Sequence, residues 1–128
     1  MSPPMSVPIL KQGEYLIASI QDALSDREVL ALRDDLSERI GRHRSRGIVI
    51  DVGALDVIDS FVARSLRAIA LMARLRGAET VIVGIQPDVA MTMVRFRLNL
   101  EPIRSALDLE EGLELLDGLT QGGSGNGR

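Results

Sequence analysis

The stretch from Ile48 to Ala63 constrains the fold of this chain more than any other segment. It begins with Ile48–Val52, a short β-branched and apolar run of the kind found in a strand buried on both faces of a helix-covered sheet. Gly53 interrupts this run, and after Phe61 the apolar residues recur at helical spacing. The members of the helical stripe are Val62, Leu66, Ile69 and Ala73. The stretch therefore predicts a buried strand, a turn and a helix in direct succession.

Ser60 stands where the strand pattern gives way to the helical one, at a position that suits a helix N-cap. Asp59 can share that role. A serine hydroxyl there lies at the rim of a strand-to-helix turn, close to free backbone N–H groups, which suits a phosphate as well as a cap. The residues by themselves favour the cap and leave phosphorylation as the alternative.

The composition limits the kinds of protein this chain can be. Its 128 residues suit one domain, and the 45% of hydrophobic residues suffice for a core that is aliphatic, because aromatic residues make up only 2%. The absence of cysteine excludes disulfides, thiolate metal sites and cysteine nucleophiles. The net charge of −3 argues against a nucleic-acid partner. Without a signal core or a run of membrane-spanning length, we expect a cytoplasmic protein with no membrane contact.

The rest of the chain predicts a regular alternation of strands and helices. Ser25 or Asp26 begins a helix with an apolar stripe. The basic connector Gly41–Gly47 suits a helix C-terminus decorated with cations better than the alternative, a phosphate-binding patch, and we expect His43 in a solvent-exposed loop. A helix with Phe96 on its buried side ends near Asn99. The expected strands are 8–12, 15–20, 48–52, 80–84 and a short edge segment from 103, and the expected helices follow 25, 60, 87 and 108.

This order predicts an α/β domain with a mixed β-sheet of four to five strands and about four α-helices. We expect a flexible arm over residues 1–6, the domain over residues 7–118 and a disordered, glycine-rich tail over residues 119–128. Asp51 and the loop from Asp56 to Ser60 follow a parallel strand, so they belong to the sheet edge where sites usually lie.

Three carboxylates, Asp51, Asp56 and Asp59, lie close enough in sequence to suggest a Mg²⁺ site like that of a receiver or a phosphatase. Against this, no lysine follows in the later strands, and no histidine or cysteine stands by for acid–base or nucleophilic work. A glycine-rich phosphate loop is missing after every predicted strand. We therefore expect no enzymatic activity, no metal and no cofactor.

Six segments together resemble a known family, and they run in order from about Pro8 to about Leu116. They are Pro8–Lys11, Ser19–Gln21, Val49–Asp51, Ile58–Phe61, Gly84–Pro87 and Ala106–Glu110. The set resembles STAS domains, the fold of anti-sigma-factor antagonists, and within them the small scaffold subunits of the bacterial stressosome. Many antagonists follow the serine with a second hydroxyl and a glycine. Here Phe61 and Val62 follow, which favours the stressosome branch over a free-standing antagonist.

The resemblance implies a phosphorylatable scaffold and switch, with Ser60 as the phosphorylated residue. Asp56, Asp59, Ser60 and Phe61 would form the loop that binds partners. The implied partners are a serine/threonine switch kinase, larger STAS-containing paralogues and a phosphatase that resets Ser60. A homodimer and a high-order assembly are also implied, and phosphorylation would release the kinase. The alternative is a free-standing antagonist that binds an anti-sigma kinase directly.

Overall fold

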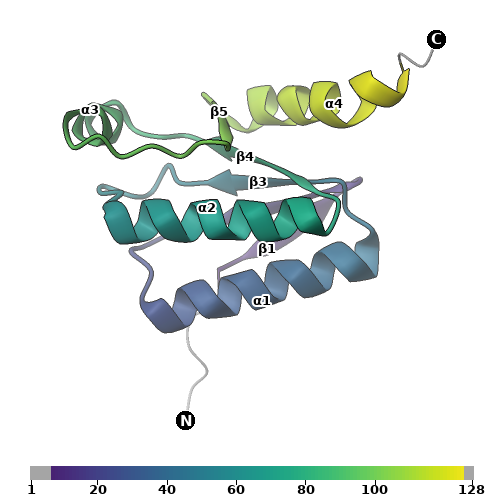
Figure 1. Cartoon of the computed structure of the whole chain (residues 1–128), viewed down its shortest axis with the longest axis horizontal. Coiled ribbons are helices and arrows are strands. Elements are labelled where there is room, and N and C mark those ends of the chain that lie inside the picture. Colours follow the sequence, from purple (N-terminus) through teal and green to yellow (C-terminus); the bar gives the residue numbers. More distant parts are fainter. Residues whose placement is uncertain (1–6, 126–128) are drawn as a thin grey trace.

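The computed structural model describes residues 7–125, so the predicted arm over 1–6 and the last residues of the predicted tail lie outside the described residues. The strands are β1 (Ile9–Gln12), β2 (Tyr15–Ser19), β3 (Gly47–Asp51), β4 (Glu79–Val83) and β5 (Arg104–Ala106). The helices are α1 (Asp26–His43), α2 (Ser60–Leu75), α3 (Pro87–Arg95) and α4 (Leu109–Gly125). The predicted order of strands and helices is thus confirmed (Figure 1).

The strands form one sheet in the order β1-β2-β3-β4-β5. The β1–β2 pair is an antiparallel hairpin, and the other three pairs are parallel. The mixed α/β sheet predicted from the sequence is therefore confirmed. Because β2, β3 and β4 run in the same direction, their carboxyl ends meet at one edge, where the loop after β3 begins.

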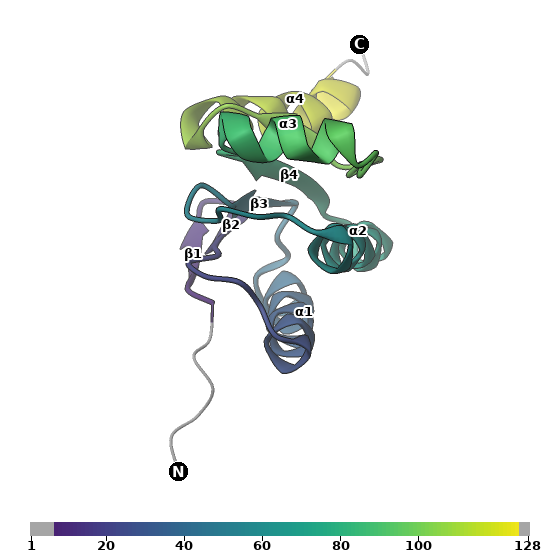
Figure 2. The same ribbon diagram turned by 90° about the vertical axis from the view of Figure 1, so that its left-hand side faces the viewer.

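Side chains alternate between the two faces of the sheet, with α1 and α2 on one side and α4 on the other (Figure 2). On one face, Leu16, Ile48 and Ile82 pack in a cluster that includes buried residues of α1, α2 and α3. On the other, Ile17, Val49 and Val81 pack with residues of α4. The central strands are thus buried on both faces, which explains why their sequences are apolar throughout rather than alternating.

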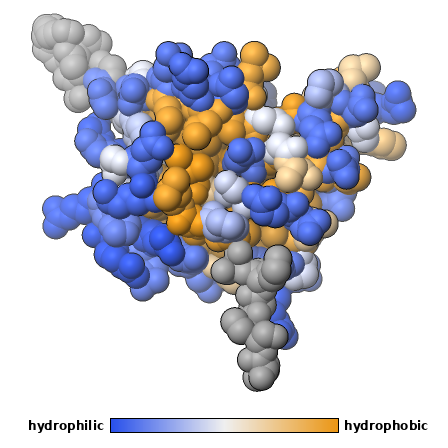
Figure 3. Space-filling model, turned by 180° about the vertical axis from the view of Figure 1, so that it is seen from behind, coloured by the Kyte–Doolittle hydropathy of each residue, from blue (hydrophilic) through white to orange (hydrophobic). Residues whose placement is uncertain are grey.

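The α4 side of the sheet is covered unevenly. The helix packs on β3, β4 and β5, and Gly112 lets it approach closely because a Cβ there would lie 2.6 Å from Cγ1 of Val83. Leu10 of β1, whose partner Ile17 lies on the α4 side, is 63% exposed. Seen from behind, the molecule carries an apolar strip between hydrophilic surfaces (Figure 3).

Helix α1 begins as predicted and ends later than predicted. Ser25 caps it through a capping box with Glu28. The helix runs to His43, so the connector begins three residues later than the predicted 41–47. The predicted cations at a helix C-terminus are confirmed, because Arg42 and His43 lie in the last turn of α1. The predicted exposure of His43 in a loop is wrong, because it is a half-buried helical residue. Arg44 then takes the left-handed conformation with φ 52°, and Ser45 N–H donates to the carbonyl of Ile40.

Helix α3 ends earlier than predicted, at Arg95 rather than near Asn99. Arg97 has φ 57° and donates to the carbonyl of Val94, while Leu98 donates to that of Met93, which is the Schellman pattern of hydrogen bonds. The helix therefore stops before Phe96 can reach the core. Phe96 is 65% exposed, so its predicted burial is wrong, whereas Met93 is buried.

The helix ends provide a matched pair of stability predictions. Gly77 and Arg44 both have positive φ, and a Cβ added at Gly77 would meet no atom within 4 Å. Gly77→Ala should lower the free energy of unfolding by about 1 kcal/mol from backbone strain alone. Arg44→Gly should raise it by a similar amount. Urea denaturation of both variants checks this, and a loss of stability in Arg44→Gly would contradict it.

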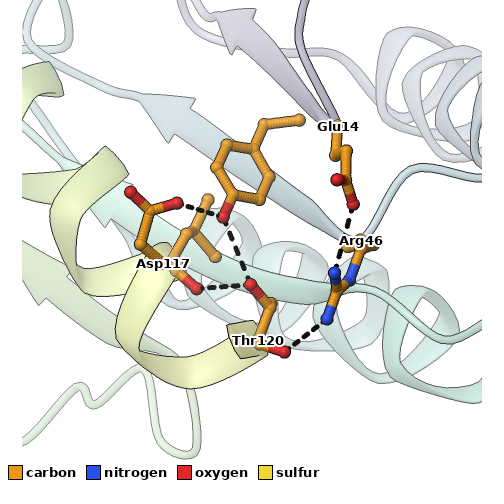
Figure 4. Close-up of polar contacts among 6 residues, drawn as sticks. Glu14, Arg46, Asp117 and Thr120 are labelled. Carbon is orange, nitrogen blue, oxygen red and sulfur yellow. Dashed lines mark hydrogen bonds and ion pairs between the residues drawn. The ribbon is translucent and has the colours of Figure 1, made fainter. Parts of the chain in front are cut away.

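A polar network fastens α4 to the end of the sheet where β2 and β3 begin (Figure 4). The Tyr15 hydroxyl donates to Oδ1 of Asp117 at 2.5 Å. Arg46 donates to the backbone carbonyl of Thr120 and forms an ion pair with Glu14 at 3.3 Å. These contacts hold the helix beyond residue 118, where the sequence predicted the domain to end. Residues 119–125 are helical, so the predicted tail is wrong over that range.

The Tyr15 phenol should make stability fall at high pH. Burial, followed by the hydrogen bond to Asp117, raises the pKa of Tyr15 above its ordinary value of 10.0. Because the folded-state pKa of Tyr15 lies above the unfolded-state pKa, the stability that the neutral phenol contributes is fully present below pH 10. This stability is lost as pH rises through the folded-state pKa. The unfolding free energy of the wild type should decline above pH 10 more steeply than that of Tyr15→Phe. Parallel slopes in urea titrations of the two proteins would contradict this prediction.

Candidate functional site

The loop between β3 and α2, residues 52–59, is held to the body of the protein by three inward apolar side chains. They are Val52, Leu55 and Ile58, all buried. The residues between and after them face solvent: Gly53, Ala54, Asp56, Val57, Asp59 and Ser60. This alternation fixes the backbone of the loop while it displays the polar side chains at the surface.

Asp51 organises the start of the loop. Its Oδ1 accepts a hydrogen bond from the backbone N–H of Gly53 at 2.8 Å. The Gly53 carbonyl in turn accepts one from Nε2 of Gln86 at 2.9 Å, which links the loop to the segment that leads into α3. Gly84, with φ 83°, allows this approach, since a Cβ there would lie 3.3 Å from the backbone of Gly53. The base of the loop is therefore braced from the neighbouring strand.

Asp59, not Ser60, is the N-cap of α2. Its Oδ1 accepts a hydrogen bond from Val62 N–H at 2.9 Å, and its carbonyl accepts one from Ala63 N–H at 2.9 Å. Ser60 is the first residue of the helix, so its predicted N-cap role is wrong by one position. Both residue types suit a cap, and the sequence could not choose between adjacent ones. The hydroxyl of Ser60 is consequently not needed as the cap.

The capping assignment predicts unequal costs for two adjacent substitutions. Asp59→Ala should lower the free energy of unfolding by about 1 kcal/mol, since it removes the cap. Ser60→Ala should change it by less than about 0.5 kcal/mol, because Ser60 is an exposed residue without a capping role. Thermal or urea unfolding of both variants measures the difference. Equal losses, or a larger loss in Ser60→Ala, would contradict the assignment.

Phe61 lies beside the loop but turns toward a groove between α1 and α2. The groove has a volume of about 410 Å³, and its walls carry both apolar and charged side chains. Its lining residues are Asp26, Val29, Leu30, Arg33, Phe61, Arg64, Ser65, Ala68 and Ile69. Of the four predicted loop residues, Asp56, Asp59 and Ser60 are thus exposed together, while Phe61 is half-buried.

Asp51 stands apart from the two exposed acids, because its carboxylate is half-buried and bonded to Gly53 N–H. Across residues 7–125, no three histidine, cysteine or acidic side chains gather in a way that could hold a metal ion. Within the same range, no helix is long and apolar enough to cross a membrane. The exposed polar surface made by Asp56, Asp59 and Ser60 therefore remains the candidate site.

Sequence reasoning did not identify Gln86, Gly84 or the groove beside Phe61 as parts of this site. Gln86 and Gly53 are far apart in sequence, and only the pairing of β3 with β4 brings them together. The one available signal was the segment Gly84–Pro87, which belongs to the resemblance described above.

The chain combines a five-stranded mixed sheet, helices on both of its faces and an exposed serine at the start of α2. The STAS domain profile matches residues 6–111, which is most of the chain. This protein belongs to the STAS domain family, so the predicted STAS fold is confirmed.

Within that family the chain is similar to RsbS. It is 37% identical to a Moorella thermoacetica RsbS in which a serine is replaced by glutamate, with a TM-score of 0.74, over 90% of this chain and 97% of the other. It is 39% identical to a chain in a structure of the stressosome, described as a signal integration and transduction hub, with a TM-score of 0.73 over 88% and 97% of the two chains.

A further relative is the RsbT co-antagonist protein RsbRA of Bacillus subtilis, 23% identical over 111 residues. The match covers 86% of this chain and 40% of that protein, so the chain spans less than half the length of this relative. The similarity to RsbS thus extends over nearly all of both chains, whereas the similarity to RsbRA involves only a part of the longer protein.

Proposed function

We propose that this chain is a non-catalytic, phosphorylatable scaffold and switch of a bacterial stressosome. It retains a serine/threonine switch kinase and releases it when Ser60 is phosphorylated. The observation that carries the proposal is the position of Ser60 at the start of α2, exposed and free of the capping role, on a loop that buried side chains hold in place. The likeness to RsbS supports the stressosome setting.

The switch acts through surface charge. A phosphate on Ser60 adds about −1.5 to −2 charges at the N-terminus of α2, where the helix dipole stabilises it. Asp59 and Asp56 already make the surface acidic, so the phosphate adds to a negative field that repels an acidic partner surface. Val52, Leu55 and Ile58 keep the loop backbone in place, so phosphorylation expels a partner without refolding of the domain.

The same residues explain why we propose a scaffold and not an enzyme. Asp56, Asp59 and Ser60 have no histidine or lysine near them in sequence, and a serine nucleophile needs an adjacent base. The kinase that modifies Ser60 and the phosphatase that resets it are therefore separate proteins, in the cytoplasm. Incubation with ATP alone should leave Ser60 unmodified.

Assembly is the second part of the proposal. We propose that the chain forms a homodimer through the β1 edge, and that larger STAS-containing paralogues join it in a high-order particle. The exposed Leu10 on the edge strand β1 favours this contact, because burying it against a second copy removes apolar surface from water. The RsbRA similarity supports a larger paralogue as the co-assembling partner.

Gel filtration of the protein with its larger STAS paralogue and the kinase tests the proposal against its alternative. A very large particle that carries the kinase, and loses it after phosphorylation of Ser60, is the expected result. A free-standing antagonist would instead give a small heterodimer with an anti-sigma kinase and no large particle. That outcome would contradict the stressosome role.

A further inference from the structure

Helix α2 carries positive charge only. Between Ser60 and Leu75 there is no aspartate or glutamate, and Arg64, Arg67 and Arg74 are all exposed. Leu71 and Leu75 are exposed among them, at 60% and 80%. At 100° per residue these five side chains fall on one outward stripe, opposite the buried Leu66 and Ile69. The outer face of α2 is therefore both basic and apolar. Exposed apolar residues that lie together beside polar ones are typical of an interaction surface.

Internal contacts neutralise little of this charge. Arg67 donates to the backbone carbonyl of Glu101 and forms no ion pair with a side chain of residues 7–121. Arg74 forms an exposed ion pair with Glu79 at 3.4 Å. Arg64 has no ion pair with any residue in the described range 7–125. The stripe keeps a net positive charge along most of the helix.

Helix α4 carries the opposite charge. From Leu109 to Gln121 it has no arginine, lysine or histidine, and its exposed acids are Glu110, Glu111, Glu114 and Asp117. Glu110 and Glu114 are four residues apart on the outward face, where like charges destabilise a helix by a few tenths of a kcal/mol. Neither of these two forms an ion pair with a described residue. Leu107, just before the helix, is exposed beside this acidic face.

The two helices lie on opposite faces of the sheet, with α2 in the cluster that covers one side and α4 in the cluster that covers the other (Figure 2). Two surfaces on opposite sides of one molecule cannot pair within it. They can pair between copies, with the basic face of one against the acidic face of the next. At 1.5 Å per residue the basic stripe from Arg64 to Leu75 is about 17 Å long and the acidic face from Glu110 to Asp117 about 10 Å, so the acidic face fits within the length of the basic one.

We propose that the outer face of α2 docks against the acidic face of α4 of a second copy of this chain. The contact is head-to-tail, so it joins copies into a ring or an extended array rather than a closed pair. It extends the assembly part of the proposed function, and it differs from the β1 edge contact. It uses the middle and C-terminal half of α2, which leaves Ser60 and its loop accessible to a kinase.

A charge swap tests this contact in the purified protein without a kinase. One variant reverses the basic face, Arg67→Glu with Arg74→Glu, and a second reverses the acidic face, Glu110→Arg with Glu114→Arg. The matched control is Arg33→Glu with Arg42→Glu, which makes the same change in net charge on the exposed side of α1. Sedimentation velocity at low and high ionic strength measures association beyond the dimer, and circular dichroism verifies folding.

Wild type and the α1 control should associate at low ionic strength and dissociate at high ionic strength, because exposed charges are screened. Each swapped variant alone should lose this association. An equimolar mixture of the two should restore it, because every α2–α4 pair between the two unlike variants is complementary. A mixture of the α1 control with the α4 variant has the same net charges as the mixture of the two swapped variants. Because the α4 variant lacks the acidic face, it ends each head-to-tail array, so this mixture should stop at small oligomers.

Three results would overturn the proposal: wild type that shows no salt-dependent association, swapped variants that associate alone, or a mixture that fails to restore association. Equal loss in the α1 control would also overturn it, since net charge would then be the cause. Leu75→Asp gives a second check, because a site 80% exposed tolerates the change without unfolding and should still weaken association. Since no kinase is present, failure here leaves the role of Ser60 untouched.

Discussion

Ser60→Asp is expected to weaken retention of the cognate kinase about tenfold, whereas Ser60→Ala should retain it like the wild type. A tenfold change corresponds to about 1.4 kcal/mol, a modest value for one like charge placed against an acidic partner surface. The aspartate carries less charge than a phosphate, so Ser60→Asp should reduce kinase retention less than phosphorylation of Ser60 does. A pull-down with purified kinase measures both variants.

Ser105→Asp is the matched control for this experiment, because Ser105 is also exposed but lies on the edge strand β5, outside the loop that carries Ser60. It adds the same charge to the molecule and should leave kinase retention unchanged. Wild-type retention by Ser60→Asp would contradict the charge mechanism. An equal loss in Ser105→Asp would show that net charge, and not its position beside Asp59, controls binding.

Leu66→Ala should lower the free energy of unfolding by about 2 to 5 kcal/mol, a large part of the stability of a small domain. Leu66 is 1% exposed in the core between α2 and the sheet, so truncation leaves a cavity. Leu71→Ala, on the exposed face of the same helix, should change stability by less than about 0.5 kcal/mol. Urea denaturation compares them, and a similar loss in both would contradict the assignment of buried and exposed faces.

The elements of the fold could be predicted because their signals are local. Val62, Leu66 and Ile69 repeat at helical spacing and are all buried. Ile48–Val52 is apolar without alternation because both faces of β3 are covered, as expected for a central parallel strand. Gly77, with φ 90°, follows the end of α2, as glycine often does at a helix C-terminus, because it takes positive φ without strain.

The helix ends that sequence reasoning misplaced are those where arginine occupies a position that usually favours glycine. Arg44 and Arg97 both have positive φ and complete the terminal hydrogen bonds of α1 and α3. An arginine gives no local sign of this conformation. The helical residues beyond 118 were missed for another reason, since Tyr15 and Arg46 hold them from distant parts of the chain.

Part of the candidate site could be predicted because its signal is local, and the rest could not because it depends on contacts between distant segments. Asp56, Asp59 and Ser60 could be identified because they directly precede a clear helical stripe. The brace from Gln86 to Gly53 and the groove beside Phe61 depend on which strands and helices are neighbours, so no local pattern could reveal them. The choice of Asp59 over Ser60 as the cap depends on a shift of one residue that propensities do not resolve.

Phosphopeptide mapping after incubation of the protein with its cognate kinase and ATP tests the central claim most directly. The measurement is paired with a pull-down of the kinase before and after the reaction. We predict a single phosphate on Ser60, with release of the kinase, and neither event in Ser60→Ala. Phosphate on Ser65 or Ser105 with Ser60→Ala still fully modified would contradict the account, as would full kinase retention after Ser60 is phosphorylated.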